Sequence, residues 1–584
     1  MTGKDNDVDS IAGAGRHRFA RTIGEGALAL VLALASVAFL TRSLASTGFT
    51  HVSADDLDGA LQLALLEHWH NVLTGAGTAP WNAPNFFYPV PDTLGYNDGY
   101  LLFGIVFTAW RGIGIDPMLA QEFTHFVFRI AGFLGLWVLV RRCFGGSVPA
   151  AAFAAILFTL ASVNALSLLH SQLTLVGLTP WALVLAGLFL EAVKDGRAGK
   201  AFACLAGLSV LTGCWILSGF YTVWFTAVLM LFGAIVILLV WRPVAMPYLR
   251  AIRQPRMLAA TAAGAAVSLP FIAGFLKVYA PKLRETGGHD AGVTLEYIPR
   301  FPQDLVNLGS HNVVWSRTLD PLYGLLSGGE SLFTNVRLEP ASSMFTPILM
   351  ICLAIAALRF QRWAAELSPG ARAAIGAGLA GAFFFYFVDF QVGGWSPWLV
   401  VAKIIPGASG LRVIPRFNLV LLIPASVGLA LWLQHDVARR RRFLAVLIAA
   451  AILVEQTSNV DLKRMQRGTV EAFLAEVGSP PAGCEAFYAV HLPESSPFWP
   501  GVVHDEPTAQ WMAADMPAML VAAAVHLPTL NGHASFLPRG WFLKKPSSDD
   551  YIERVHAFAR EHGVGPLCVL DLTTRDWMPD LVTP

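Results

Sequence analysis

Residues 51–100 read HVSADDLDGALQLALLEHWHNVLTGAGTAPWNAPNFFYPVPDTLGYNDGY and follow directly after the first long apolar run of the chain. This acidic stretch contains no lysine and no arginine. Its carboxylates belong to Asp55, Asp56, Asp58, Glu67, Asp92 and Asp98. Because only 14% of the residues of the whole chain are charged, this concentration of one sign in one segment indicates a site with chemistry, around which the rest of the chain is organised.

The composition is that of a membrane protein. Of the 584 residues, 55% are hydrophobic, and the mean hydropathy is +0.55. A soluble globular protein carries about 25% charged residues, so lipid must replace water as the solvent for most of this chain. The net charge is +1, and no basic stripe with interleaved aromatic residues is present. These features argue against nucleic acid as a partner and make the lipid bilayer the expected one.

Apolar runs predict a mainly α-helical bundle with about eleven membrane spans, since a span needs roughly 20 apolar residues. The expected spans are 23–41, 118–140, 149–169, 173–191, 201–217, 220–240, 257–278, 344–360, 373–390, 418–434 and 443–457. The first has no fitting cleavage site and is expected to be a signal anchor after a cytoplasmic segment, residues 1–22. Lys and Arg gather in alternate loops, such as Arg439 to Arg442, which places the N-terminus in the cytoplasm and the C-terminus outside.

With these spans and this orientation, three of the regions between spans are long and lie outside the cytoplasm, namely 42–117, 279–343 and 391–417. Within the first of them, Leu101 to Ile115 is apolar but too short to span a bilayer, and Arg111 interrupts it. We therefore expect an interfacial or re-entrant helix there. The third region is rich in glycine and proline and is expected to dip back toward the bilayer surface.

From residue 458 onward the chain is richer in charge and proline. Strand-like runs at 487–490 and 567–570 alternate with helical patterns at 513–525 and 551–562. This alternation predicts a small α/β domain of about 125 residues, which is a usual size for one domain.

The expected organisation is thus a membrane domain, residues 23–457, followed by an extracytoplasmic α/β domain, residues 458–584. The C-terminal domain contains Cys484 and Cys568. An oxidising compartment favours a disulfide between them, and two reduced thiols are the alternative.

Ser53 or Asp55 can cap the helix that follows, because Ser and Asp side chains accept the free N–H groups of a first turn. On this helix Asp55, Asp58 and Gln62 share one side. Asp56 lies on a neighbouring face. Converging carboxylates suit a divalent cation such as Mg²⁺ or Mn²⁺, with Asp55 and Asp58 as its ligands, or they supply a general base. The alternative is that acidic residues in a first turn only suit the helix dipole.

Asp98 and Tyr88 are further candidates in the acidic stretch. Asp98 precedes the interfacial helix and either caps it or adds a carboxylate to the site. Tyr88 belongs to an aromatic cluster with Trp81, Phe86 and Phe87. Such a cluster suits either anchoring at the membrane interface or the face of a sugar ring.

Arg129 is the most anomalous residue inside an expected span, since a charge in the bilayer is costly and is functional by default. Glu122, His125 and Arg129 share one face of their helix, so either a relay or a structural Glu–Arg pair fits. A position about two turns below the external surface also suits the binding of a phosphate.

Three further cations, Lys403, Arg412 and Arg416, lie in KIIPGASGLRVIPRFN on the expected external side, just before a span. The positive-inside rule disfavours them there. The phosphate of a lipid-linked substrate would account for them, and snorkelling toward headgroups is the alternative. His170 and Gln172, in the external turn LLHSQLT, can line the same cavity.

The motifs ADDLDG, EHWHNVLTG, WNAPNFFYP and PDTLGYND, with PGASGLRVIPRF and PTLNG further along, resemble bacterial multi-span glycosyltransferases of the GT-C superfamily. The resemblance implies a GT-C-like fold in the bacterial plasma (inner) membrane. It also implies transfer, with inversion, of a hexosyl or pentosyl group from a polyprenyl-phosphate donor to a glycan, lipid or protein acceptor outside the cytoplasm. It places the catalytic carboxylate at Asp55, with Asp58 beside it. The spacing D-x-x-D, with Asp56 next to Asp55, departs from better-known members and leaves the identity of the base and a need for metal open.

We hypothesise that Asp55 deprotonates or orients an acceptor hydroxyl, while Arg412, Arg416 and Arg129 stabilise the charge of the departing phosphate. The competing class is non-enzymatic: a transporter or flippase of lipid-linked glycans, or an envelope-assembly protein. A transporter is expected to place charges near the bilayer midplane, whereas the acidic stretch of this chain is a loop. That difference favours the enzyme.

Overall fold

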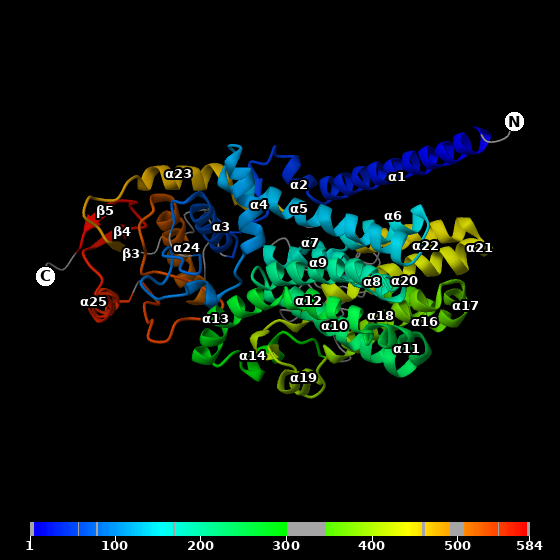
Figure 1. Cartoon of the computed structure of the whole chain (residues 1–584). Coiled ribbons are helices and arrows are strands. Elements are labelled where there is room, and N and C mark those ends of the chain that lie inside the picture. The colour runs from blue at the N-terminus through cyan, green and yellow to red at the C-terminus, as the bar shows by residue number, and fades with distance from the viewer. Residues whose placement is uncertain are drawn as a thin grey trace, which may run out of the picture.

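The computed structural model describes residues 5–580, with gaps at 56–57, 78–79, 167–169, 301–345, 458–461, 491–506 and 547, and it describes only the backbone of 5–22, 165–166 and 507–513. Asp56 and most of the expected external loop 279–343 therefore lie outside the described residues. Figure 1 shows a bundle of long helices on one side and a smaller region with the C-terminal strands on the other. The N-terminal helix α1 (Asp5–Leu40) extends away from the bundle.

In the described part of the chain, eight helical segments are long and apolar enough to cross a membrane, or nine if a pair of helices bent by 62° counts as one span. The eight segments are Ile23–Leu40, Pro117–Cys143, Ser171–Lys194, Ala198–Ile216, Phe220–Val240, Pro255–Thr286, Pro369–Val388 and Ile414–Arg440. The chain is a multi-pass membrane protein, as its composition predicts. Which side of the membrane each end occupies stays a prediction.

These segments are built from single helices or from two that follow directly on each other. Their bounds are α5 (Pro117–Val138) with η2 (Leu139–Cys143), η4 (Ser171–Leu178) with α8 (Thr179–Lys194), α9 (Ala198–Ile216), α10 (Phe220–Val240), α12 (Pro255–Ala266) with α13 (Leu269–Thr286), α18 (Pro369–Val388), and η8 (Ile414–Phe417) with α20 (Asn418–Trp432), η9 (Leu433–Val437) and α21 (Ala438–Arg440). The bent pair joins α16 (Pro347–Leu358) to α17 (Phe360–Trp363) and η6 (Ala364–Glu366).

The described residues thus contain eight or nine long spans rather than the eleven expected, because two expected spans are short helices. α6 (Val148–Leu160) has 13 residues and ends before the short α7 (Ser162–Leu166). α22 (Arg442–Gln456) has 15 residues. Both are shorter than the roughly 20 residues that cross a bilayer. The lengths of these two helices were overestimated from the sequence, because apolar residues continue past the ends of the helices.

The centre of the bundle is α20, in which every residue from Asn418 to Trp432 is buried. It packs against α6, α10, α16 and α18. A helix that is apolar on all sides is stable only when it is surrounded, so the sequence of α20 itself accounts for its central place. Its position fixes η8, directly before it, against α10.

Short elements connect the long ones. Their bounds are α2 (Arg42–Ala45), β1 (His51–Val52), α3 (Asp58–Thr74), η1 (Thr93–Tyr96), α4 (Leu101–Gly112), α11 (Arg242–Ile252), α14 (Ala291–Glu296), α19 (Trp398–Ile404) and η7 (Ala408–Gly410). As expected from its length, α4 is too short to span, with 12 residues. It packs against α3 and α5. Nε of Arg111 on α4 lies 3.1 Å from Oε1 of Glu67 on α3, so this cation neutralises one carboxylate of the acidic stretch.

The C-terminal region contains β2 (Met465–Gln466), α23 (Arg467–Val477), β3 (Ala486–Val490), α24 (Pro507–Val525), α25 (Tyr551–His562), β4 (Leu567–Asp571) and β5 (Trp577–Pro579). β3 and β4 are parallel, with Ala486 opposite Leu567, and β5 is antiparallel to β4. All residues of β3 and β4 are buried. Cys484 and Cys568 form the expected disulfide. The small α/β region predicted from the alternating patterns is confirmed.

The C-terminal region is joined to the acidic stretch at several places. β1 pairs with β2 in antiparallel fashion, and α24 packs beside α3. The side chains of both parts form one apolar core that is continuous from α3 to β4. The acidic stretch is therefore held between the membrane helices and the C-terminal region.

Candidate functional site

A carboxylate–imidazole pair forms the centre of the site. Asp58 is the first residue of α3, and its Oδ2 lies 3.0 Å from Nδ1 of His170. His170 directly precedes η4, the first turn of a membrane segment. The side chains of Asp58 and His170 are 37% and 27% exposed, so the pair faces accessible space rather than the core.

Amides and hydroxyls surround this pair on the side of η4. Gln62, one turn along α3 from Asp58, donates from Nε2 to Oε1 of Gln172 (3.4 Å), and the Tyr100 hydroxyl donates to the same Oε1 (3.1 Å). The Ser171 hydroxyl donates to Oε1 of Gln62. These bonds hold α3, η4 and the start of α4 in one arrangement and orient the side chains around Asp58.

A second carboxylate, that of Asp98, lies at the N-terminus of α10. Its Oδ1 accepts a hydrogen bond of 2.8 Å from the backbone N–H of Phe220, the first residue of α10. Asp98 therefore caps α10 and not the interfacial helix. It also lies near the charge of Arg416 and near the hydroxyl groups of Tyr100 and Tyr279.

Arg416 supplies the buried cation of the site. It belongs to η8, at the start of the central membrane segment, and is only 6% exposed. Its guanidinium lies 5.3 Å from the centre of the Tyr221 ring, and its charge acts on both Asp58 and Asp98. Arg412 is exposed and lies 5.4 Å from the centre of the Tyr297 ring.

His533 reaches the same place from the C-terminal region. Its imidazole is half-buried and interacts electrostatically with Asp58 and with the cations of Arg412 and Lys544. Burial lowers the pKa of His533 to about 4, with Arg412 and Lys544 acting in the same direction and Asp58 against it.

We call this set of side chains the Asp58 cluster; its members are Asp58, Gln62, Asp98, Tyr100, His170, Gln172, Arg416 and His533. It lies where three membrane segments begin, at Ser171, Phe220 and Ile414. Helix N-termini carry partial positive charge and free N–H groups, which suit anions. The cluster thus places the guanidinium of Arg416 and the N-termini of these three segments near the carboxylates of Asp58 and Asp98.

The two carboxylates of the cluster differ in protonation. Burial raises the pKa of Asp58, but the hydrogen bond and charge of His170, together with the charges of His533 and Arg416, outweigh burial and lower the pKa to about 2. Burial raises the pKa of Asp98 to about 6, although the Phe220 N–H and Arg416 oppose the shift. At neutral pH Asp58 is thus fully ionised, whereas Asp98 titrates close to neutrality.

Other expected site residues make contacts of a different kind. Asp55 is a helix cap: its Oδ1 accepts a hydrogen bond of 2.8 Å from the backbone N–H of Gly59. Tyr88 lies at the junction with the C-terminal region, where its hydroxyl donates to Oε1 of Glu485 (3.3 Å). Lys403 is exposed in the last turn of α19.

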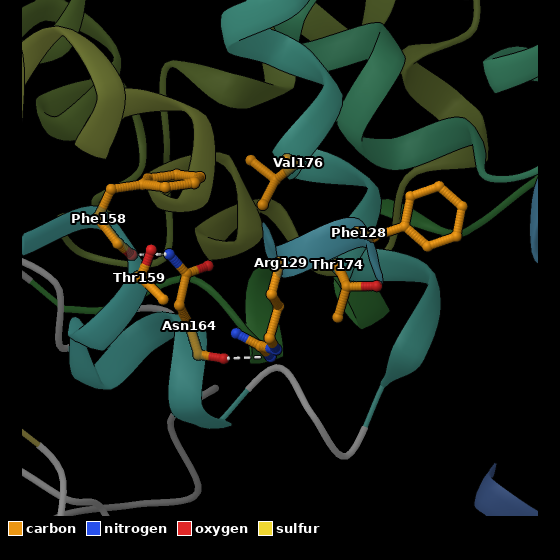
Figure 2. Close-up of a pocket in the computed structure, with 8 residues that line it drawn as sticks. Phe128, Arg129, Phe158, Thr159, Asn164, Thr174 and Val176 are labelled. Atoms are coloured by element: carbon orange, nitrogen blue, oxygen red, sulfur yellow. Dashed lines mark hydrogen bonds between the residues drawn. The ribbon is translucent and has the colours of Figure 1, made fainter. Parts of the chain in front are cut away.

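Arg129 lines a separate pocket, shown in Figure 2, which encloses about 240 Å³ including space open to solvent. Arg129 is 6% exposed, and its Nη2 donates to the backbone carbonyl of Asn164 (2.7 Å). The rest of the wall is formed by Phe128, Phe158, Thr159, Asn164, Thr174, Val176 and Gly177.

Among the described residues, hydrogen bonds do not connect Glu122, His125 and Arg129, although the charges of Glu122 and Arg129 act on each other. Glu122 accepts hydrogen bonds at Oε2 from the backbone N–H and the hydroxyl of Ser53. Both ring nitrogens of His125 are buried without a hydrogen-bond partner among the described residues. The three residues thus share a helix face, as predicted, but Glu122 bonds to Ser53 and Arg129 to Asn164.

The sequence left open whether Asp55 and Asp58 hold a divalent cation or supply a general base. Among the residues that the structure describes, no three His, Cys, Asp or Glu side chains converge closely enough to hold a metal ion. Asp55 bonds the backbone of α3 and Asp58 bonds His170. Since Mg²⁺ is often held by one or two carboxylates together with water and substrate phosphates, a metal ion at Asp58 stays a prediction.

Sequence reasoning missed Tyr100 and His533. Tyr100 follows GYNDG directly, and only its hydrogen bond to Gln172 reveals its role. His533 follows the PTLNG motif, but it comes to Asp58 through the packing of the C-terminal region. No periodicity in the sequence predicts such a long-range approach.

No protein-family model matches this sequence, and no protein of curated function matches it. Solved structures do match. The archaeal oligosaccharyltransferase AglB from Archaeoglobus fulgidus, in complex with an inhibitory peptide and a dolichol-phosphate, is similar with a TM-score of 0.51 and 13% identity, over 94% of this chain and 69% of that chain. The apo form of the Archaeoglobus fulgidus oligosaccharyltransferase gives a TM-score of 0.49 and 12% identity, over 93% and 69%. The arabinofuranosyltransferase AftD from Mycobacteria gives 0.49 and 17% identity, over 92% of this chain and 35% of that chain.

The similarity to AglB extends over nearly the whole chain and shows the fold. The GT-C-like architecture expected from the sequence motifs is thereby confirmed.

Proposed function

We propose that this protein transfers a sugar from a polyprenyl-phosphate donor to an acceptor hydroxyl or amide, at the Asp58 cluster. The observation that carries the proposal is that an ionised, partly exposed carboxylate and a buried guanidinium, whose charges act on each other, lie at the ends of three membrane segments. A donor with a lipid tail and a phosphate head needs a cation at the membrane boundary, and its acceptor needs a carboxylate opposite.

Asp58 is the residue that we assign to the acceptor. Its Oδ2 is oriented by His170, and its carboxylate is ionised at neutral pH because its pKa is about 2. It can accept a hydrogen bond from the acceptor group and take up the proton as the new glycosidic bond forms. Asp98, whose pKa is raised to about 6, is the second carboxylate in reach of the same charges.

Arg416 is the residue that we assign to the leaving phosphate. As the bond between the sugar and the phosphate breaks, negative charge grows on the phosphate oxygens, and a positioned cation stabilises that charge. The N-termini of η4, η8 and α10 add to the positive potential. The exposed Arg412 and the more distant Arg129 are secondary candidates for the lipid phosphate. Support comes from AglB, whose structure contains a dolichol-phosphate.

The test is transfer from lipid-linked sugars by the purified, full-length protein and its Asp58→Asn variant. Loss of a general base reduces rates by about 10²–10⁴-fold, and we expect a loss of that order. Asp55→Asn separates the two aspartates, because Asn can still accept the cap bond from Gly59 and should keep most activity. Asp92→Asn, in the same loop but outside the cluster, is the matched control.

If Asp58→Asn transfers sugar as fast as the wild type, the assignment of Asp58 is wrong. If Asp55→Asn alone is inactive, the catalytic role returns to Asp55. If the wild type transfers no sugar from any polyprenyl-phosphate donor while it still binds and translocates such lipids, the transport alternative is correct.

A further inference from the structure

The segment between α24 and α25 is built into the acidic stretch, although the two are distant in the sequence. The backbone N–H groups of Phe87 and Tyr88 donate to the carbonyls of Asn531 (2.9 Å) and Thr529 (3.0 Å). The N–H of Thr529 donates to the carbonyl of Pro84 (3.1 Å). These bonds form a short strand-like bridge between the C-terminal region and the first loop.

On its other side the same segment bonds the C-terminal sheet. The N–H of Leu530 donates to the carbonyl of Phe487 in β3 (2.9 Å), and the N–H of Ala489 donates to Oδ1 of Asn531 (2.7 Å). Nδ2 of Asn531 donates to Oδ1 of Asp515 (3.0 Å) and to the hydroxyl of Tyr551 (3.2 Å). Asn531 is fully buried. These hydrogen bonds fix the position of the Asn531 side chain, and His533 follows two residues later.

A second set of contacts fixes the chain after His533. The Ser535 hydroxyl donates to Oδ1 of Asn97 (3.0 Å), and the N–H of Phe536 donates to the carbonyl of Tyr96 (3.0 Å). The ring of Phe536 stacks on that of His289 with centres 4.6 Å apart. Since Asn97 directly precedes Asp98, this contact ties the His533 segment to the second carboxylate of the cluster.

His533 is thus held between two anchors, near enough to Asp58 for the two side chains to interact electrostatically, and its ring is partly buried with Nδ1 shielded from solvent. A positioned imidazole near an ionised carboxylate is the arrangement of a ligand-contacting group.

We infer that His533 is a substrate-contacting residue, supplied by the C-terminal region, that binds a neutral hydroxyl-bearing acceptor opposite Asp58. The inference rests on the proposed function and adds the class of acceptor to it. A neutral imidazole has one N–H donor and one acceptor nitrogen, which matches a sugar hydroxyl and its neighbour. An anionic group is served by Arg416 and Arg412 instead, so donor and acceptor are recognised by different parts of the chain.

The test compares KM for donor and acceptor in the wild type, His533→Ala and His533→Gln. Removing one neutral hydrogen bond weakens binding about fivefold, so we expect His533→Ala to raise the KM for the acceptor about fivefold and leave the KM for the donor unchanged. Gln can still donate and accept, and it should restore most of the loss. His526→Asn, an exposed histidine of the same region, is the control. Resistance of the Cys484–Cys568 disulfide to alkylating reagents without reductant verifies that the region has folded.

An unchanged acceptor KM in His533→Ala, or an equal rise for the donor, would overturn the inference while leaving the proposed function intact. If the wild type transfers no sugar, the proposed function fails, and protection of His533 from diethyl pyrocarbonate decides the inference by itself. Protection by neutral oligosaccharides from the cell envelope, and not by polyprenyl monophosphate, supports it. Protection by the lipid phosphate alone, or by neither probe, contradicts it.

Discussion

Nδ1 of His170 lies 3.0 Å from Oδ2 of Asp58, and this contact joins the first residue of α3 to the start of a membrane segment. The contact has a direct consequence for the charge of the carboxylate. Burial raises the pKa of Asp58, and the hydrogen bond and charge of His170 are the largest influences that lower it, to about 2. Because the pKa in the folded protein is below the ordinary value of 3.8, the stability that this pair contributes is present above pH 3.8 and is lost as pH falls toward 2.

Replacing His170 by Ala should therefore raise the pKa of Asp58. If ionised Asp58 is needed for transfer, the acid limb of the pH profile of kcat/KM should move to higher pH, by about one unit. The measurement is sugar transfer from pH 8 down to about pH 2, because the wild-type limb is expected near the pKa of Asp58. His70→Ala, on the same helix but against Phe107, should leave the acid limb where it is. A limb that does not move in His170→Ala means that Asp58 does not carry the pH dependence.

Arg416 and Arg412 should respond very differently to substitution by Gln. Arg416 is 6% exposed near two carboxylates, and removal of a buried cation from its partners costs about 3 kcal/mol of unfolding free energy. Its loss should also reduce transfer by about 10²-fold, in line with the loss of one transition-state donor. Arg412 is exposed, and its loss should cost less than about 1 kcal/mol.

The measurements for these arginine variants are thermal unfolding in detergent and competition of polyprenyl monophosphate with the donor. Arg416→Lys serves as a second variant, because it keeps the charge but not the planar fork of donors. Equal effects of the two Gln variants on competition by the lipid would contradict a special role for Arg416.

Much of the fold follows from the sequence because apolar runs are local signals. The positions of α5, α9, α10 and α18 agree with the expected spans to within a few residues. The lengths of α6 and α22 were overestimated, since hydropathy does not reveal where a helix ends inside an apolar run.

The site was less predictable, because its members come from five separate segments. Asp58, Asp98, His170 and Arg416 were all candidates on the basis of residue type and position, and the structure brings them together. The choice of Asp55 over Asp58 as first candidate depended on the resemblance. Whether an aspartate caps the helix or joins the Asp58 cluster depends on the residue at which the helix begins. The periodicity of the sequence cannot distinguish two aspartates that lie three residues apart at that point.

Asp515 should make the stability of the C-terminal region depend on pH. It is fully buried: Oδ1 accepts hydrogen bonds from Asn531 and Gly532, and Oδ2 has no partner among the described residues. Burial raises its pKa to about 8 from the ordinary 3.8. Between these values the unfolded chain has lost a proton that the folded chain keeps, so stability falls as pH rises from about 4 to 8.

The Asp515→Asn variant removes this titration, and its unfolding temperature should fall less than that of the wild type as pH rises from 4.5 to 8.5. The quantity to measure is the difference between the two proteins at each pH, which cancels the titration of all other groups. Asp549→Asn, an exposed aspartate of the same region, should behave as the wild type. Parallel curves for Asp515→Asn and the wild type would show that Asp515 does not bind a proton in this range.

Gly532 should be intolerant of a side chain because it lies against Phe87. A Cβ atom at Gly532 would lie 2.5 Å from Cδ1 of Phe87, whose ring is fully buried and packs edge-on against Trp541 at 4.8 Å. Overpacking of this kind costs about 1–3 kcal/mol. We therefore expect Gly532→Ala to lower the unfolding temperature and to raise the acceptor KM, since His533 is its neighbour in the chain.

The double variant Gly532→Ala with Phe87→Leu separates the clash from a general effect on the segment. A smaller side chain at 87 gives the new methyl group space, so the two substitutions together should cost less than the sum of their separate costs, with a coupling of about 1 kcal/mol. Thermal unfolding of the four proteins of the cycle measures that coupling. The acceptor KM should recover along with it, because the bridge between Phe87 and Asn531 holds the His533 segment to the first loop. Additive costs would mean that Gly532 is constrained by something other than the Phe87 ring, and the packing that links the C-terminal region to the site would have to be assigned differently.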